Sequence, residues 1–353
     1  MSVNLDSMEM RKMIDPEDML SYVEQFDEQC NQGERLAVDF PLPRYDDIKH
    51  VIICGMGGSA IGGDILRAYA SREAALPIEV VRNYILPRYV DSKSLVVVSS
   101  YSGNTEETLS SYEEAKKRSA KIVAITTGGK LAQCCEEDGF PYLRIPAGYA
   151  PRAALGFSFM PLLVFMQRWG FIDGQKQAIA EMKRTITETI QSNRFSTPES
   201  ENPAKQLARR LFDTIPVIYA GEGAFQPVAA RWRTQCNENA KVFARDFSVP
   251  EMNHNEILGW KNPASILCRF HVIYLLDKEY HEQIHKRFAV MESILQSSVH
   301  GVTKISSTGN GLLARLFSLI VLGDFTSVYL AYLYRQDPTP IPAIDQLKKA
   351  LAQ

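Results

Sequence analysis

The sequence has few features that would indicate a disulfide framework, a zinc site or a dithiol redox motif. It contains six cysteines, and no two of them form a C-x-x-C pair. Paired cysteines or a His-rich cluster would be needed for such sites, so we expect no metal and no cofactor. The cysteines are interpreted as reduced thiols, as is usual inside a cell.

A strong charge of one sign is also missing, because 39 Lys and Arg residues are balanced by 41 Asp and Glu residues. The formal net charge of -2 provides no basic field that would attract nucleic acid or an anionic membrane. Nucleic acid and membranes are therefore not expected as partners, although local basic groups could still bind a small anion.

Long uninterrupted hydrophobic runs are absent as well. Residues 1–20 are polar and acidic, without the apolar segment of a signal peptide. The stretch 153–166 is too short to span a bilayer, and the stretch 312–334 is interrupted by Arg315 and Asp324. Both stretches predict buried helices, and we expect a cytoplasmic protein.

What the sequence does contain is a repeated alternation of strands and helices. The length of 353 residues suggests two domains, and 45% hydrophobic residues are enough for sizeable cores. Short β-branched runs predict strands at 50–54, 78–82, 94–100, 121–126, 142–145, 215–220, within 265–276 and at 302–306. Alternation with helices indicates an α/β fold with mostly parallel sheets flanked by helices. We expect an N-terminal helical segment (1–45), a first domain (46–192) and a second domain with a C-terminal helical tail (193–353).

Two loops in the first domain predict a phosphate site. Each follows a predicted strand, and the carboxyl ends of parallel strands meet at one edge of a sheet. Glycine allows close approach of the backbone to an anion, and the N–H groups of a helix's first turn point at it. Hydroxyl groups add donors that suit a phosphomonoester. The candidate phosphate ligands are Gly57, Gly58, Ser59, Ser100, Ser102 and Thr105.

Two alternatives for the glycine loop remain open. Gly55, Gly57 and Ala60 fit the dinucleotide fingerprint G-x-G-x-x-A, but Glu79 lies inside the next strand rather than at its end. The glycines could also serve tight turns only, which leaves the hydroxyl-rich loop 100–105 unexplained. The loop lacks the lysine of G-x-x-x-x-G-K, so nucleotide hydrolysis is not expected.

Three further polar residues are candidates for chemistry. Arg152 precedes an apolar helix, where a cation is costly unless it meets an anion. Glu238 stands between two asparagines on a helix, and His254 stands between two asparagines in a turn. The alternatives are a helix-end salt bridge for Arg152, a solvated helix face for Glu238 and a capping histidine for His254.

The second domain resembles a degenerate copy of the first, with one difference. It contains no counterpart of the hydroxyl-rich loop, and residues 277–279 (Asp-Lys-Glu) stand in its place. Two acidic side chains would repel a phosphate, so we expect a single phosphate site.

Five motifs together resemble the bifunctional phosphoglucose/phosphomannose isomerase family, which belongs to the phosphoglucose isomerase superfamily and is built from two sugar-isomerase (SIS) domains. They occur in the family's order and span nearly the whole chain. The motifs are GMGGSAIGG (55–63), SYSGNTEET (100–108), PRAALG (151–156), NENAK (237–241) and NHNE (253–256).

The resemblance implies a role for each matching position. Ser59, Ser100, Ser102 and Thr105 would hold the substrate phosphate, and Glu238 would move a proton between C1 and C2. Arg152 would stabilise the enediolate. His254 and Lys348 would assist ring opening, and Lys349 is the alternative to Lys348. Thr339 would position the substrate or a water for the mannose reaction.

The implied activity is the metal-independent interconversion of glucose 6-phosphate and mannose 6-phosphate with fructose 6-phosphate through a cis-enediol. The protein would be an intramolecular oxidoreductase of carbohydrate metabolism, acting in glycolysis and gluconeogenesis. Superfamily members are homodimers, and the resemblance implies that His254 is contributed across the interface. The alternative is a non-catalytic SIS-type regulator that binds a phosphosugar, for which the phosphate loops alone would suffice.

Overall fold

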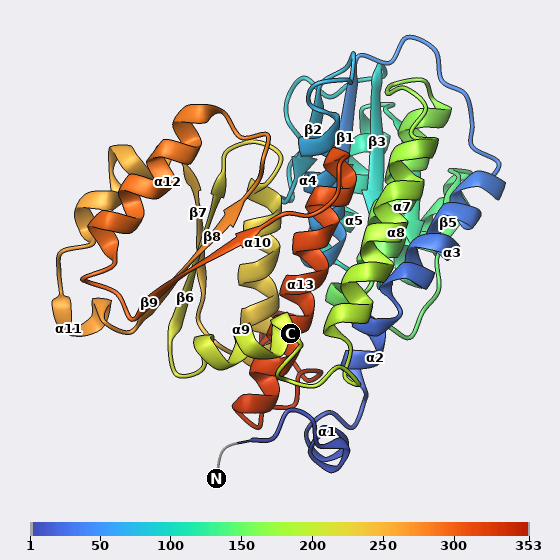
Figure 1. The fold of residues 1–353 in the computed structure, drawn as a ribbon. Coiled ribbons are helices and arrows are strands. Elements are labelled where there is room, and N and C mark those ends of the chain that lie inside the picture. Colours follow the sequence, from blue (N-terminus) through green and yellow to red (C-terminus); the bar gives the residue numbers. More distant parts are fainter. Residues whose placement is uncertain (1–2, 352–353) are drawn as a thin grey trace. The chain divides into compact units, whose positions relative to one another are not determined.

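The computed structural model describes residues 3–351 and consists of two compact units. One unit comprises Gln25–Lys183 and is called the β1–β5 unit here. The other comprises the chain up to Glu24 and again from Arg184 onward, and is called the β6–β9 unit. Both have parallel sheets flanked by helices (Figure 1), so the predicted α/β fold is confirmed.

The β1–β5 unit has a five-stranded parallel sheet in the order β2-β1-β3-β4-β5. Its strands are β1 (His50–Cys54), β2 (Ile78–Val81), β3 (Ser94–Ser99), β4 (Lys121–Thr126) and β5 (Tyr142–Arg144). Its helices are α3 (Phe26–Asp39), α4 (Gly57–Ala70), α5 (Glu106–Lys117), α6 (Gly129–Asp138), a 3₁₀-helix (Pro151–Ala153) and α7 (Leu155–Arg168), while α8 (Lys176–Asn193) continues into the other unit.

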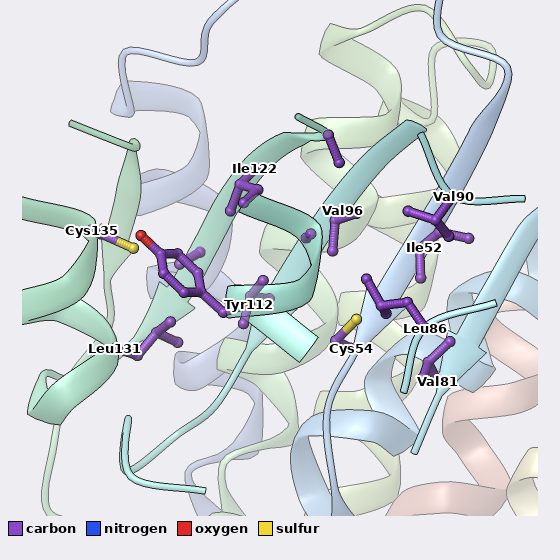
Figure 2. Close-up of a cluster of buried hydrophobic side chains, with 14 residues drawn as sticks. Ile52, Cys54, Val81, Leu86, Val90, Val96, Tyr112, Ile122, Leu131 and Cys135 are labelled. Atoms are coloured by element: carbon purple, nitrogen blue, oxygen red, sulfur yellow. The ribbon is translucent and has the colours of Figure 1, made fainter. Parts of the chain in front are cut away.

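Helices cover both faces of this sheet. On one face, side chains of α5 and α6, including Tyr112 and Leu131, pack on the central strands (Figure 2). On the other face, Gly63 of α4 lies against Ile53. As a result every residue of β3 is buried. A parallel strand covered on both faces is a continuous apolar run, which explains why the sequence pattern located it.

The β6–β9 unit has a four-stranded parallel sheet in the order β7-β6-β8-β9. Its strands are β6 (Ile215–Gly221), β7 (Arg245–Val249), β8 (Phe270–Leu276) and β9 (Gly301–Ser306). Its helices are α1 (Met8–Ile14), α2 (Met19–Glu24), α9 (Pro203–Leu211), α10 (Gln226–Gln235), a π-helix (Cys236–Ala240), two 3₁₀-helices (Glu251–His254, Glu256–Gly259), α11 (Ala264–Leu267), α12 (Glu282–Leu295), α13 (Leu312–Leu333) and α14 (Pro342–Leu351).

Two features differ from the sequence-based expectations. Strand β7 was not predicted, because it is a short edge strand with two charged residues among its five. The N-terminal helical region is divided, since α1 and α2 group with the β6–β9 unit and α3 with the β1–β5 unit. The domain limits 1–45, 46–192 and 193–353 remain a prediction.

Both long apolar stretches form buried helices, as predicted. Helix α7 is buried from Leu155 to Met166. Among the described residues, α13 is the one helix long and apolar enough to cross a membrane, and it is buried inside the protein. Its two charged residues are buried in ion pairs, Arg315 with Asp277 and Asp324 with Arg231. These features are those of a core helix.

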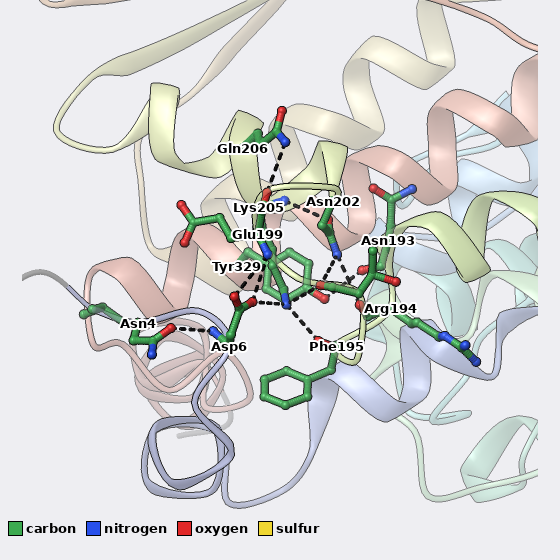
Figure 3. Close-up of polar contacts among 12 residues, drawn as sticks. Asn4, Asp6, Asn193, Arg194, Phe195, Glu199, Asn202, Lys205, Gln206 and Tyr329 are labelled. Carbon is green, nitrogen blue, oxygen red and sulfur yellow. Dashed lines mark hydrogen bonds and ion pairs between the residues drawn. The ribbon is translucent and has the colours of Figure 1, made fainter.

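A buried lysine joins the N-terminal residues to the β6–β9 unit (Figure 3). Lys205 has no exposed surface, and its Nζ lies 2.7 Å from Asp6 Oδ1. The same ammonium donates to the carbonyl oxygens of Phe195 and Thr197, both at 2.8 Å. Three acceptors match the three N–H groups of an ammonium, which offsets the cost of its burial.

Candidate active site

The first predicted phosphate loop connects β1 to α4, which begins at Gly57. A side chain at Gly58 is impossible here, because a Cβ would lie 2.4 Å from the carbonyl oxygen of Pro151. The loop therefore needs glycine in order to pack against the 3₁₀-helix that carries Arg152. Ser59, in the first turn of α4, is buried. The N–H groups of Ser59 and Ala60 donate to the carbonyl oxygen of Met56, at 3.0 and 3.3 Å, and the positive end of the helix dipole favours an anion beside this turn.

The second loop connects β3 to α5 and contacts the first directly. The backbone N–H of Tyr101 donates to Ser59 Oγ at 3.2 Å. Within the loop, Ser100 Oγ donates to Thr105 Oγ1 at 3.1 Å, and the N–H of Asn104 donates to Ser102 Oγ at 3.3 Å. The structure thus brings the two predicted loops together at the carboxyl edge of one sheet.

Close backbone packing shapes the second loop. Gly103 has a φ of +68°, and a Cβ there would lie 1.8 Å from the carbonyl oxygen of Gly128. Thr105 is the N-cap residue of α5, with extended backbone. The hydroxyls of the loop consequently lie beside a second helix N-terminus, which favours an anion for the same electrostatic reason as the first.

Arg152 is only 4% exposed and lies next to the glycine loop. Its backbone nitrogen is 3.1 Å from the point where a Cβ on Gly58 would stand. The 3₁₀-helix that carries Arg152 is thus packed against the glycine loop, and burial of a cation is costly unless an anion or other acceptors meet it.

The alternative of a dinucleotide site finds no support in the neighbouring strand. The carboxylate of Glu79 accepts a hydrogen bond from the Tyr89 hydroxyl, and Arg82 pairs with Asp64 on α4. The acidic residue that would bind a ribose is therefore engaged in a local contact.

Glu238 lies in the β6–β9 unit, on the π-helix that continues α10. The adjacent asparagines anchor this turn: Asn237 Oδ1 accepts from the N–H of Ala244 at 3.0 Å, and Asn239 Nδ2 donates to Ser327 Oγ at 2.9 Å. Glu238 is partly buried, so it does not lie on a simple solvated face. π-Helical turns are rare and often mark functional sites.

A lysine that the sequence analysis left without a role connects this turn to Thr339. Lys241 Nζ donates to the carbonyl oxygens of Asp337 and Pro338, at 2.8 and 2.9 Å. The N–H of Thr339 donates to Asp337 Oδ1 at 2.9 Å. The only available signal was the position of Lys241 at the end of the NENAK motif, because its partners are about a hundred residues away in sequence.

The other two predicted catalytic side chains are exposed. His254 ends a 3₁₀-helix after β7, and its neighbours have separate tasks. Asn253 accepts a hydrogen bond from Arg287, and Asn255 donates to Glu251. Lys348 lies on α14, which has no buried residue, so Lys348 and Lys349 are both in contact with solvent.

In the β6–β9 unit, the position that corresponds to the hydroxyl-rich loop is filled by an ion-pair cluster. Arg315 Nε lies 2.8 Å from Asp277 Oδ2, and its Nη2 lies 2.6 Å from Glu279 Oε2. Ser307 Oγ also donates to Asp277, at 2.6 Å. The sequence analysis identified the two acidic residues but not Arg315, which comes from a distant helix.

Among residues 3–351, no cluster of three or more His, Cys, Asp or Glu side chains is arranged to hold a metal ion.

Comparison with known proteins agrees with this geometry. Residues 45–137 match the SIS domain model, and residues 200–351 match the model of the bacterial phospho-glucose isomerase C-terminal SIS domain. The two predicted SIS domains are thus confirmed. A glucose-6-phosphate isomerase like protein from Thermus thermophilus has the same fold, with a TM-score of 0.66 at 18% identity, over 98% of this chain and 99% of that one.

Curated relatives identify the family. The bifunctional phosphoglucose/phosphomannose isomerase of Caldicellulosiruptor bescii is 44% identical over 96% of this chain and 98% of its own length. The protein of the same name from Aquifex aeolicus is 35% identical over 86% of this chain and 90% of its own length. The chain therefore belongs to the bifunctional phosphoglucose/phosphomannose isomerase family.

Proposed function

We propose that the protein interconverts glucose 6-phosphate and mannose 6-phosphate with fructose 6-phosphate. The observation that carries the proposal is the pair of joined loops in the β1–β5 unit, with a buried arginine beside them. Hydroxyl donors and helix N-termini suit the phosphate of the sugar, and Ser59, Ser100, Ser102, Thr105 and the backbone at Gly57 and Gly58 are its proposed ligands.

The proposed reaction is a proton transfer within one substrate molecule. The carboxylate of Glu238 removes the proton from C2 of the open-chain aldose, and the C1 carbonyl oxygen gains negative charge. Arg152 stabilises this enediolate. The proton on O2 then passes to O1, and protonated Glu238 returns a proton to C1, which yields the ketose with a hydroxyl on C1 and a carbonyl at C2. No electron leaves the substrate, so the reaction consumes no redox cofactor.

Both epimers can use one base. Glucose 6-phosphate and mannose 6-phosphate differ in configuration at C2, and removal of the C2 proton abolishes that difference. Rotation about the C2–C3 bond would present either hydrogen to Glu238. In this proposal Thr339 positions the substrate or a water near C2, while His254 and Lys348 assist ring opening.

A homodimer is part of the proposal, with His254 contributed to the partner's site. His254 is exposed, and two large apolar side chains near it in the sequence are exposed as well. Leu258 is 80% exposed, and Phe243 is 71% exposed. Coverage by a second copy would remove these side chains from water, which supports the homodimer. We also assign the protein to the cytoplasm, where its proposed substrates occur.

A non-catalytic phosphosugar-binding regulator is the less favoured function. Such a protein needs only the phosphate loops. The full-length relatives named above are isomerases, and the anchored π-turn around Glu238 has no evident purpose in a regulator.

The test is conversion of each sugar by purified protein in excess EDTA, followed as fructose 6-phosphate formation. We expect both substrates to react, because Arg152 supplies the positive charge and a divalent ion has no assigned task. Conversion of glucose 6-phosphate alone would reduce the function to phosphoglucose isomerase. Loss of both activities in EDTA would contradict the metal-independent mechanism, and activity with neither sugar at any metal concentration would favour the regulator.

A further inference from the structure

Helices α10 and α13 lie side by side in the β6–β9 unit (Figure 1). A line of side-chain contacts joins them. At the start of this line, Trp232 Nε1 donates to the carbonyl oxygen of Leu319 at 2.9 Å. The indole lies directly over Gly323, where a Cβ would be 2.4 Å from the ring. The close approach of the two helices therefore depends on a glycine.

The next contacts centre on the buried carboxylate of Asp324. Arg231 binds it with two parallel hydrogen bonds, from Nε at 2.9 Å and from Nη2 at 2.7 Å. Gln235 Nε2 adds a third, at 3.0 Å. All three side chains are buried. A bidentate pair of this kind fixes orientation as well as distance, so the register between α10 and α13 is set here.

The final contact reaches the π-helix. Asn239 Nδ2 donates to Ser327 Oγ at 2.9 Å, and Ser327 Oγ donates to the carbonyl oxygen of Asp324 at 2.7 Å. The contact of Trp232 with Leu319 at one end and that of Asn239 with Ser327 at the other show that the two segments run parallel. The line of contacts ends at the residue that directly follows Glu238.

We infer that Asn239 and Ser327, held in register by Asp324, are positioning residues for Glu238. The inference rests on the proposed role of Glu238 as the base. A π-turn departs from ordinary α-helical hydrogen bonding and needs tertiary contacts to persist. The Asn239–Ser327 hydrogen bond supplies one on the α13 side, and it thereby sets the direction in which the Glu238 carboxylate points.

The first test replaces Ser327 with alanine. Loss of the acceptor frees the π-turn, and kcat should fall by about tenfold to a hundredfold, since sub-ångström displacement of a base has effects of this order. KM and inhibition by inorganic phosphate should stay within about twofold of the wild type, because the phosphate ligands are untouched. If Ser327 contributed only to stability, Ser327→Ala would lower the melting temperature but would not lower kcat at unchanged KM.

The matched control is Thr326→Val. Thr326 is the neighbouring buried hydroxyl on α13, and it donates to the carbonyl oxygen of Leu322 in its own helix. It should keep wild-type kcat. Asn239→Ala and the double variant with Ser327→Ala complete a double-mutant cycle. If the Asn239–Ser327 hydrogen bond transmits the effect, kcat of the double variant should be no lower than that of the worse single variant.

Wild-type kcat in folded Ser327→Ala would overturn the inference, as would an equal loss in Thr326→Val or fully additive losses in the cycle. These outcomes differ from failure of the proposed function. A wild type without isomerase activity, or full turnover in Glu238→Gln, would overturn both, whereas a Glu238-dependent enzyme that tolerates Ser327→Ala would overturn the positioning role alone.

Discussion

The two units share a sheet topology but use the carboxyl ends of their central strands differently. In the β1–β5 unit, β1 and β3 lead to glycine and hydroxyl loops that contact each other through Ser59 and Tyr101. In the β6–β9 unit, the corresponding strands are β6 and β8. The loop after β8 carries Asp277, whose carboxylate is buried against Arg315.

Tyr280 is a second difference between the two units, because it occupies the end of β6. The hydroxyl of Tyr280 accepts a hydrogen bond from the N–H of Gly221, at the end of β6, and donates to the carbonyl oxygen of Leu275. Its ring lies 2.6 Å from the point where a Cβ on Gly221 would stand. The N–H of Gly221 and the guanidinium of Arg315 thus both bind groups of the protein itself. The comparison shows that topology provides the location of a site, whereas the loop residues decide whether a ligand can use it.

The largest expected effect comes from breaking the ion pair of the β6–β9 unit. Arg315→Met leaves the buried carboxylate of Asp277 without its cation, so the free energy of unfolding should fall by about 3–5 kcal/mol. Chemical denaturation measures the change. Lys286→Met, which breaks an exposed pair with Glu282, should change stability by less than about 0.5 kcal/mol. If Arg315→Met lowered the free energy of unfolding by a similarly small amount, the Arg315–Asp277 ion pair would not be what stabilises this loop.

The next effect concerns Glu238, the proposed base, which lies in the β6–β9 unit rather than in the unit with the proposed phosphate loops. Glu238→Gln should lower isomerisation of both sugars at least about a hundredfold, because an amide cannot accept the C2 proton. Phosphate binding, measured by calorimetry, should be unchanged. Glu282→Gln, at an exposed position on α12, serves as the control. Near-wild-type turnover in Glu238→Gln would remove this residue from the mechanism.

Single hydroxyl deletions in the β1–β5 unit should have intermediate effects. Ser59→Ala and Thr105→Ala each remove a proposed donor to a charged oxygen, which should weaken substrate and phosphate binding by about 1.5–3 kcal/mol. Ser307→Ala deletes a hydroxyl beside the ion-pair cluster of the other unit, and phosphate affinity should be unaffected. If Ser307→Ala weakened phosphate binding as much as Ser59→Ala, the assignment of the anion site to the β1–β5 unit would be wrong.

The smallest expected effect is on the pH dependence of stability, through the ion pair between Asp6 and Lys205. Partial burial acts to raise the pKa of Asp6, but hydrogen bonds from Lys205 and Glu199 and the nearby positive charges lower it below its usual value. The contribution to stability is therefore present above the unfolded pKa of 3.8 and is lost as the pH falls through the lower, folded pKa. The Asp6 side chain is 42% exposed, and the amide oxygen of an asparagine could still accept a hydrogen bond from buried Lys205, so Asp6→Asn should cost only about 1 kcal/mol at pH 7.

Denaturation at neutral and acidic pH tests this last prediction. The difference between wild type and Asp6→Asn should be present at pH 7 and should shrink as Asp6 becomes protonated in the wild type. A difference that grows on acidification would contradict the lowered pKa.

The sequence by itself determined the parallel α/β architecture and the positions of the two loops that we propose bind phosphate. Strands such as 94–99 are continuous apolar runs because both faces are covered, and glycine and hydroxyl residues directly follow them. Such signals are local, so they can be recognised without knowledge of the fold. The edge strand β7 could not be found in this way. Its charged residues Arg245 and Asp246 are exposed or only partly buried, so the strand is not a continuous apolar run.

Only the tertiary structure decided which polar residues act together. The partners of Asp277, Lys241 and Asn239 lie between about 40 and 100 residues away in sequence, on α13 or just after it. The π-turn at Glu238 likewise makes a buried hydrogen bond to a distant residue, from Asn239 to Ser327. Long-range pairing of buried polar groups leaves no periodic trace in the sequence, which is the physical reason that it appeared only once the chain was folded.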